Sequence, residues 1–277
     1  MRNLKGKAIV ITGAASGIGQ ALAMALGERG ARLLLSDIDA VGLEQVVSAL
    51  RDQGTVCFGQ VSDTGDENAI HNLAAQAILR LGAADVLINN AGVALVAPVG
   101  KLQTSDAHWL MNINFWGVVH GCRAFLPQMQ TRPEAMLVNI SSIFAMVSMP
   151  TQSIYNASKA AVRGFSDALR EELRGTPVRV LCVHPGGIRT NIANMARVTD
   201  VSMVADSAQK MRAQFDTVAR TSAQEAAQAI ISAIEANKTR LLIGTDAKVL
   251  DLLYRLAPAR ASKWFAALGN YQRRKSA

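Results

Sequence analysis

The stretch Thr12-Gly-Ala-Ala-Ser-Gly-Ile-Gly19 joins a short apolar run to a longer amphipathic one near the start of the chain. This pattern predicts a strand at Lys7–Thr12 and a helix near 18–29. The three glycines permit a tight turn and let the backbone approach a pyrophosphate, which the positive end of the helix attracts. Their spacing, G-x-x-x-G-x-G, differs from the common G-x-G-x-x-G. A glycine-rich turn without a ligand is the alternative, but the flanking strand and helix favour a nucleotide site.

The rest of the chain repeats this alternation of short β-rich runs and longer helical patterns. Further strands are predicted at Ala31–Ser36, Thr55–Phe58, Asp85–Asn89, Met136–Ser141, Val178–His184 and Arg240–Ile243. Further helices are predicted near 40–52, 66–81, 105–130, 153–174 and 223–236. Two helix starts fit capping boxes, Thr64-Gly-Asp-Glu67 and Ser222-Ala-Gln-Glu225. Such alternation is typical of βαβ units and predicts an α/β fold, with a single doubly wound parallel sheet flanked by helices.

An acidic residue, Asp37, follows the second predicted strand, eighteen residues after Gly19. A carboxylate at this place can accept hydrogen bonds from both ribose hydroxyls of NAD and would repel the 2′-phosphate of NADP. Sites for NADP usually bind that phosphate with a basic residue, and neither Ser16 nor Ile38 is basic. The alternative is an acid that stabilises the start of the next helix. We expect NAD to be preferred over NADP.

A second stretch, Ser153-Ile-Tyr-Asn-Ala-Ser-Lys-Ala160, places Tyr155 and Lys159 four residues apart. On a helix this spacing puts both side chains on one face, about one turn apart. A phenol ordinarily titrates near ~10, and a neighbouring ammonium favours the phenolate. We therefore expect Lys159 to lower the pKa of Tyr155 towards the range of general acid–base catalysis. A half-buried tyrosine beside a solvated lysine is the alternative.

Several motifs occur together in one order along the chain: Thr12–Gly19, Asn89-Asn-Ala-Gly92, Asn114, Ser142, the Tyr155/Lys159 pair and Pro185-Gly186. In this order and spacing the chain resembles the short-chain dehydrogenase/reductase family from about residue 5 to 245. The resemblance implies a Rossmann sheet of about seven parallel strands, a nicotinamide cofactor and a Ser-Tyr-Lys-Asn active site. It divides the chain into an NAD(P)-binding catalytic domain, residues 1–245, and a basic amphipathic helical extension of it, residues 246–277.

The resemblance also implies a catalytic role for four residues. Tyr155 would exchange a proton with the substrate oxygen during hydride transfer, and Lys159 would hold the nicotinamide ribose and stabilise the phenolate. Ser142 would hydrogen-bond the substrate oxygen and stabilise developing charge. Asn114, a residue type unfavourable inside a helix, would hold a water that links Lys159 to solvent. A satisfied polar group at a helix kink is the alternative for Asn114.

Cofactor contacts are implied by the same resemblance along the whole domain. They are Gly13, Ser16, Gly17, Ile18, Gly19, Asp37, Ile38, Gln60, Val61, Asn90, Ala91, Gly92, Tyr155, Lys159, Pro185, Gly186, Ile188 and Thr190. The segment Asn89–Gly92 would close around the adenosine side, and Pro185–Thr190 would cover the carboxamide. The chain departs from the family at Gln60, where an Asp usually contacts the adenine amine. The glutamine carbonyl oxygen can accept the same hydrogen bond.

These residues predict an NAD-dependent oxidoreductase that interconverts a secondary or lipophilic alcohol and its carbonyl compound. An NADP-dependent carbonyl or ketoacyl reductase and a non-catalytic nucleotide-binding scaffold are the alternatives. The lipophilic substrate is suggested by methionines in the expected substrate loop Asn191–Arg220 and by three residues after Ser142. They are Met195, Met203 and Met211 in the loop, and Phe144, Met146 and Met149 after the serine. Methionine-rich surfaces adapt to irregular apolar ligands, although the same residues are also common in cores.

Composition argues against several other classes of protein. The three cysteines, Cys57, Cys122 and Cys182, form no metal-ligand pattern, so no metal site is expected, and they are typical of a reducing compartment. The first strand begins too early to leave room for a signal peptide, and no apolar run approaches the ~18 residues of a membrane span. We therefore expect a cytoplasmic protein. The body shows no basic stripe with aromatics, which argues against nucleic-acid binding.

The C-terminal extension is basic and partly apolar. Six basic and no acidic residues lie from Arg255 onward, out of a net charge of +8 for the whole chain. Asp246–Leu256 is expected to form a broad apolar face of Val249, Leu250, Leu252, Leu253 and Leu256, and Ser262–Leu268 adds Trp264, Phe265 and Leu268. We expect this face to pack over the substrate pocket or a partner subunit in a homodimer or homotetramer. Peripheral contact with an anionic membrane is the alternative.

Overall fold

A computed structural model describes residues 1, 3–190, 192, 195–198 and 221–260 of the chain. Two predicted features lie largely outside these residues: the part of the substrate loop that holds Met203 and Met211, and the segment Ser262–Leu268. What was expected of them stays a prediction. Within the described ranges, no helix has both the length and the apolar character needed to cross a membrane.

Strands and helices follow one another in the predicted order. The strands of the main sheet are β1 (Ala8–Thr12), β2 (Arg32–Asp37), β3 (Cys57–Val61), β4 (Val86–Asn89), β6 (Ala135–Ile140), β7 (Val178–Pro185) and β11 (Arg240–Ile243). Short strands are β5 (Leu95–Val96), β8 (Ile188–Arg189), β9 (Arg197–Val198) and β10 (Thr221–Ser222). The α-helices are α1 (Gly17–Glu28), α2 (Ala40–Asp52), α3 (Glu67–Leu81), α4 (Thr104–Met111), α5 (Gly117–Gln130), α6 (Ser153–Glu172), α8 (Ala223–Glu235) and α9 (Thr245–Leu256). Shorter helical turns are η1 (Val99–Lys101), the π-helical η2 (Asn112–Trp116) and η3 (Ile143–Ala145).

The main sheet has seven parallel strands in the order β11-β7-β6-β4-β1-β2-β3. Strand β1 lies inside the sheet and pairs with both β2 and β4, so the direction of winding reverses there. Open α/β sheets bind ligands beyond the carboxyl ends of their strands at such a reversal point. The prediction of an α/β fold with a single doubly wound Rossmann sheet is confirmed.

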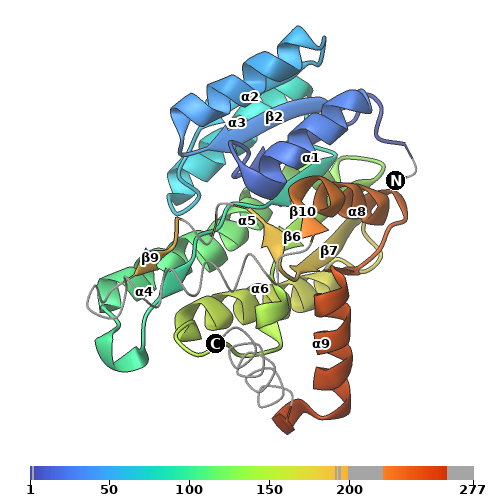
Figure 1. Cartoon of the computed structure of the whole chain (residues 1–277). Helices are drawn as coiled ribbons and strands as arrows, with labels where there is room; N and C mark the ends of the chain where they lie inside the picture. The colour runs from blue at the N-terminus through green and yellow to red at the C-terminus, as the bar shows by residue number, and fades with distance from the viewer. Residues whose placement is uncertain (2, 191, 193–194, 199–220, 261–277) are drawn as a thin grey trace.

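Apolar side chains alternate between the two faces of the sheet because successive residues of a strand point to opposite sides. On β1, Ile9 and Ile11 join the cluster packed under α1, α2 and α8, whereas Ala8 and Val10 join the cluster under α3, α5 and α6. Figure 1 shows α1 and α8 side by side on the first of these faces. The core therefore consists of two layers, and the loops at the carboxyl edge stay free to form a site.

One of the two predicted capping boxes is confirmed. At the start of α8, the hydroxyl of Ser222 accepts from the amide of Glu225, and the Glu225 carboxylate accepts from the amide of Ser222. The box predicted at Thr64 is wrong. Helix α3 starts after Asp66, whose carboxylate accepts from the amides of Asn68 and Ala69, so it already satisfies the first free donors of the helix.

Helix α9 follows the last strand directly and packs back onto the segment after Ser142. Ala247 and Leu250 of α9 form a small apolar cluster with the residues Ile143, Met146 and Val147. In Figure 1, α9 is the red helix that runs away from the sheet edge near β7. The start of the predicted extension thus covers one wall of the site that contains Ser142.

The broad apolar face predicted for α9 is only partly buried. Leu250 lies in the cluster, whereas Val249, Leu252 and Leu256 are 50%, 56% and 74% exposed. Asp251 occupies part of the buried face of α9. Its carboxylate is buried and accepts hydrogen bonds from Arg240 and Arg255. Helical periodicity predicted the amphipathic helix but not which of its apolar residues would find a partner.

Candidate active site

The glycine-rich turn between β1 and α1 is packed so closely that side chains are excluded. Gly13 has a φ of +66°, and a Cβ on it would lie 2.8 Å from the Cα of Ala91. A Cβ on Gly19 would overlap the carbonyl of Gly13. Gly17 also has a positive φ, and its Cβ position lies 3.3 Å from the methyl group of Thr190. The structure therefore brings together the turn and two other segments predicted to hold the cofactor.

Asn90 holds this turn from the neighbouring strand end. Its side-chain amide donates to the carbonyls of Thr12 and Gly13 at 3.0 and 2.9 Å. In return, the hydroxyl of Thr12 accepts from the amides of Asn90 and Ala91. The side-chain amide of Asn90 therefore fixes the shape of the turn. Its role as a cofactor contact stays a prediction.

Asp37 lies at the end of β2, next to the same turn. Its carboxylate accepts from the amides of Ala15 and Asp39 at 2.9 and 3.0 Å. Ile38 is 68% exposed and Val61, at the end of the adjacent strand β3, is 52% exposed. Solvent-exposed aliphatic side chains on both sides of an acid fit an adenosine-binding edge. The side-chain amide of Gln60 donates to the carbonyl of Val61 at 3.4 Å, and this bond does not use the side-chain carbonyl oxygen that was predicted to accept from adenine.

Helix α6 places Tyr155 and Lys159 on one face, as predicted. The ammonium nitrogen of Lys159 lies 5.9 Å from the centre of the Tyr155 ring and donates to the carbonyl of Ile140 at 3.0 Å. Lys159 is buried, and this burial lowers the pKa of its ammonium from 10.5 to about 8. The alternative of a solvated lysine beside the tyrosine is therefore excluded.

The predicted lowering of the Tyr155 pKa is wrong for the protein without a cofactor. Burial raises the pKa of the phenol to about 12, while a hydrogen bond with Ser142 opposes that shift. The physical reason is that desolvation penalises a phenolate in an apolar site, while the ammonium of Lys159 donates its hydrogen bond to the carbonyl of Ile140. The ring of Phe144 meets the Tyr155 ring edge-on at 6.3 Å and contributes to that apolar surrounding.

Ser142 sits where β6 ends and η3 begins. The Ser142 hydroxyl accepts a hydrogen bond from the amide of Phe144 at 3.1 Å. It also hydrogen-bonds the phenol of Tyr155. Behind it, the ring of the buried His184 lies 3.3 Å from the Ser142 carbonyl, and burial lowers the pKa of that imidazole to about 4. The predicted serine and tyrosine therefore form one hydrogen-bonded pair, supported by a neutral histidine.

Asn114 lies in η2, a π-helical turn that interrupts the predicted 105–130 helix between α4 and α5. Its side chain is buried; it accepts from the amide of Val93 at 2.8 Å and donates to the Val93 carbonyl and the Ser158 hydroxyl. Such π-turns widen a helix and often mark functional sites. The alternative noted for Asn114, a satisfied polar group at a helix irregularity, therefore describes its contacts.

Gly92 shows how closely Asn114 and Lys159 approach each other. A Cβ on Gly92 would lie 3.2 Å from the amide oxygen of Asn114 and 3.3 Å from the ammonium nitrogen of Lys159. Both groups thus face the same small space above the Asn89–Gly92 segment. The four residues predicted to be catalytic come from three segments, namely η2 (Asn114), the turn after β6 (Ser142) and α6 (Tyr155 and Lys159), and they are gathered at one edge of the sheet.

The Pro185–Thr190 segment leaves the end of β7 as a turn beside β11. The amide of Gly186 donates to the carbonyl of Ile243 at 2.9 Å, and the amide of Gly187 donates to the carboxylate of Asp246 at 2.7 Å. Ile188 is buried and belongs to β8, which pairs with β10. Sequence reasoning missed Asp246, and no local signal marks it, because it lies 59 residues away from its partner.

Two apolar residues expected to line the substrate site differ in their surroundings. Phe144 faces Tyr155, whereas the side chain of Met146 is buried in the α9 cluster and its sulfur lies 3.2 Å from the guanidinium of Arg240. Met195 is described and exposed. Met146 is therefore a core residue, whereas Phe144 remains a candidate for the wall of the substrate pocket.

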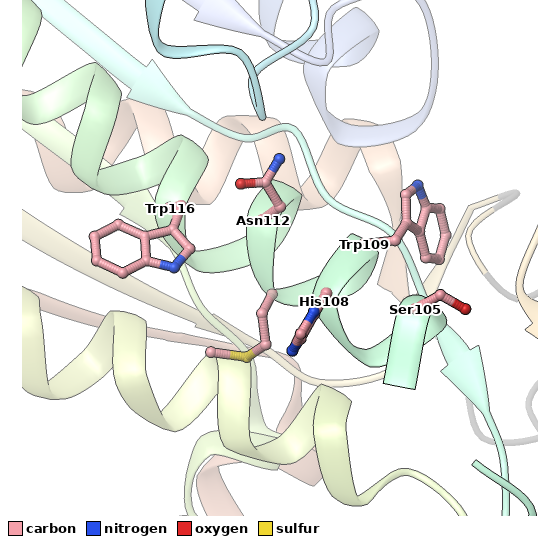
Figure 2. Close-up of a pocket in the computed structure, with 6 residues that line it drawn as sticks. Ser105, His108, Trp109, Asn112 and Trp116 are labelled. Carbon is pink, nitrogen blue, oxygen red and sulfur yellow. The ribbon is translucent and has the colours of Figure 1, made fainter. Parts of the chain in front are cut away.

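A separate hollow of about 480 Å³ is lined by side chains of α4 and η2. Its lining residues are Ser105, His108, Trp109, Met111, Asn112 and Trp116. Figure 2 shows these side chains spreading from α4 and η2, with Trp116 at one end and Trp109 and Ser105 at the other. None of the predicted catalytic or cofactor residues contributes to it, so we regard it as a surface groove and not as the reaction site.

Comparison with known proteins places this arrangement in a family. Residues 7–200 match the family described as short chain dehydrogenase. A putative oxidoreductase, SadH, of Mycobacterium tuberculosis is 38% identical over 270 residues, 96% of each chain. The 1-deoxy-11-beta-hydroxypentalenate dehydrogenase of Streptomyces avermitilis is 35% identical over 89% of this chain and 87% of its own.

A solved structure supports the same assignment. The short chain dehydrogenase/reductase of Burkholderia phymatum, determined in complex with NAD, superposes with a TM-score of 0.83 at 29% identity. The match covers 92% of this chain and 96% of that one. These similarities confirm what the motifs indicated: the chain belongs to the short-chain dehydrogenase/reductase family.

Proposed function

We propose that this protein is an NAD-dependent oxidoreductase that interconverts a secondary, lipophilic alcohol and its carbonyl compound. The observation that carries the proposal is the grouping of Ser142, Tyr155 and Lys159 beside the glycine-rich turn, with the serine hydroxyl bonded to the phenol. A scaffold that only bound a nucleotide would have no use for such a proton-transfer pair. The family is one of oxidoreductases, which agrees with this reading.

The residues present fit a nicotinamide adenine dinucleotide. At Gly13 and Gly19 a side chain would clash with the backbone, so the turn can pack as tightly as a pyrophosphate-binding loop requires, and the helix start behind it favours a pyrophosphate. Asp37 at the end of β2 would accept hydrogen bonds from the two adenosine ribose hydroxyls. No basic residue stands at position 16 or 38 to bind a 2′-phosphate. This is why we propose NAD over NADP, and the NAD complex of the Burkholderia phymatum relative supports that choice.

When bound, the nicotinamide accepts or donates the hydride, and the chain's own residues handle the proton. The Tyr155 phenol donates its proton to the carbonyl oxygen in the direction of reduction and accepts it in the direction of oxidation. Ser142 donates a hydrogen bond to the same oxygen and so orients it and stabilises its developing charge. Because burial raises the pKa of the phenol to about 12, Tyr155 carries its proton before the cofactor binds.

Lys159 is proposed to hold the ribose of the nicotinamide half and to pass protons onward. Its pKa of about 8 lets it release a proton near neutral pH, which a fully solvated lysine does not do. With a cofactor bound, a protonated Lys159, whose nitrogen lies 5.9 Å from the centre of the Tyr155 ring, would lower the cost of forming the phenolate. Asn114 would keep a water near Lys159 at the small space above Gly92.

The substrate is proposed to be bulky and apolar, such as a steroid, a retinoid or a long-chain compound. The aromatic ring of Phe144 beside Tyr155 supports an apolar wall at the reacting oxygen. The relative acting on a hydroxypentalenate, a compound named as an alcohol, fits this class. We further propose a cytoplasmic homodimer or homotetramer whose segment 246–277 covers the pocket or a partner subunit; contact with a membrane surface is the competing proposal.

A screen of lipophilic secondary alcohols and ketones tests this proposal, with the absorbance of NADH as the readout. We expect NAD-dependent oxidation of at least one apolar alcohol and slower reaction with NADP. Faster turnover with NADPH would favour the alternative of an NADP-dependent carbonyl or ketoacyl reductase. Tight NAD binding without turnover of any compound in either direction would favour the scaffold.

A further inference from the structure

The turn Pro185–Gly187 is held by an acid from outside the predicted catalytic domain. The amide of Gly187 donates to the carboxylate of Asp246 at 2.7 Å, and Asp246 lies in the first turn of α9. The family resemblance implies that this turn covers the nicotinamide carboxamide. Asp246 itself was assigned to the extension, and the sequence motifs give it no role.

The backbone around Asp246 is shaped to admit its carboxylate. A Cβ on Gly186 would overlap the carboxylate oxygens, and so would a Cβ on Gly244, the residue before α9. Gly244 also has a φ of +93°, a conformation that other residues rarely adopt. Gly186 follows β7 and Gly244 follows β11. Because neither glycine has a side chain, the carboxylate of Asp246 fits against both of them.

The position of the acid is fixed from three sides. Strands β7 and β11 pair up to Pro185 and Ile243, so the turn and the start of α9 leave the sheet side by side. The carboxylate lies at the amino end of α9, where the helix dipole favours a negative charge. Ala247, the next residue, anchors the helix in the cluster with Ile143.

We propose that Asp246 is a positioning residue that sets the height of the Pro185–Gly187 turn over the nicotinamide half of the cofactor. Through it, α9 joins the two walls of the site, the turn on one side and the segment after Ser142 on the other. A free amide on Gly187 would leave the turn able to move away from the ring. The inference rests on the proposed function, since it requires a nicotinamide beneath the turn.

The test compares the binding of NAD with that of ADP-ribose, which has the same adenosine and pyrophosphate groups but lacks nicotinamide. Calorimetric titration of Asp246→Ala should show NAD affinity lowered about tenfold or more, the loss expected for a hydrogen bond to a charged acceptor. ADP-ribose affinity should change by less than about twofold, because its site lies at the other strands. Asp246→Asn keeps an acceptor oxygen for the Gly187 amide and should retain most of the NAD affinity.

A matched control on the same helix is Asp251→Asn, which weakens the contacts with Arg240 and Arg255 but does not touch the turn. It should lower the melting temperature and leave the ratio of the two affinities unchanged. If Asp246→Ala does not fold, Asp246→Ser takes its place, since serine is too short to reach the Gly187 amide in the same way.

Each outcome decides the matter. Selective loss of NAD binding supports the inference. Equal NAD affinity in wild type and the folded alanine or serine variant overturns it and leaves the proposed function standing, as does an equal loss for both ligands. A wild-type protein that binds neither ligand overturns the inference together with the proposed function.

Discussion

The free energy of unfolding of the cofactor-free protein should depend on pH through the titration of Lys159. Replacing Lys159 by methionine should remove this dependence. Methionine keeps the length of the side chain but carries no charge. In the folded protein the pKa of Lys159 is lowered from 10.5 to about 8. Below pH 8 the lysine is protonated in both the folded and the unfolded states, so its contribution does not change with pH. Between pH 8 and 10.5 the unfolded chain binds more protons, and the stability of the wild type therefore rises with pH.

The size of the effect follows from the two pKa values. One pKa unit corresponds to ~1.36 kcal/mol, so the wild type should gain about 2 kcal/mol relative to Lys159→Met between pH 7 and 9.5. Burial raises the pKa values of Cys57, Cys122 and Cys182, and their ionisation in the unfolded chain lowers stability over part of the same range. Both proteins contain these cysteines, so the contributions of Cys57 and Cys122 cancel in the difference. Cys182 interacts electrostatically with Lys159, but burial is the larger cause of both pKa shifts, so most of its contribution cancels as well.

Urea unfolding at several pH values measures this difference directly. Lys248→Met is the matched control, because Lys248 is exposed on α9; its pH curve should stay parallel to that of the wild type. The reasoning would be refuted if the free energies of unfolding of wild type and Lys159→Met differed by the same amount, within about 0.3 kcal/mol, at every pH from 7 to 9.5. Lys159 would then keep its proton in the folded site, and its proposed part in proton transfer would lose its basis.

The other predictions concern the cofactor and the substrate. Asp37→Ala should weaken NAD binding by ~1.5–3 kcal/mol and narrow the preference over NADP, measured by titration with both; unchanged discrimination would show that Asp37 only caps the turn. Gly92→Ala should lower turnover about tenfold, because its Cβ would lie 3.2 Å from Asn114 and 3.3 Å from Lys159. Gly164→Ala on α6, where a Cβ meets nothing within 4 Å, should leave activity intact, and equal loss in both variants would contradict the packing argument. Deleting residues 258–277 should raise the KM for lipophilic substrates more than that for NAD. Salt-sensitive binding to anionic vesicles, lost on this deletion with unchanged kinetics, would instead favour the membrane reading.

Most of the fold followed from local patterns. Strand–helix alternation predicted the parallel sheet, and the glycines at 13 and 17 predicted a turn whose positive φ angles only glycine adopts easily. Helix periodicity also placed Tyr155 and Lys159 on one face. These features depend on neighbours within a few residues, which is the information that a single sequence holds.

What the sequence did not reveal depends on distant neighbours. Spacing alone placed an ammonium next to the phenol, but the pKa of Tyr155 is governed by desolvation, which only the packed site determines. Thr64 fits a capping motif, but Asp66 lies nearer to the helix start and takes the free amides. The bond between Asp246 and Gly187 joins two strand ends that meet only in the sheet.

The most direct test of the account is the turnover of Tyr155→Phe with the best alcohol found in the screen. Phenylalanine keeps the ring but has no proton to exchange. The account predicts that NAD affinity stays within about twofold while kcat falls by ~10²–10⁴, the usual contribution of general acid–base catalysis. Near-normal kcat in this variant would contradict the central claim that Tyr155 transfers the proton.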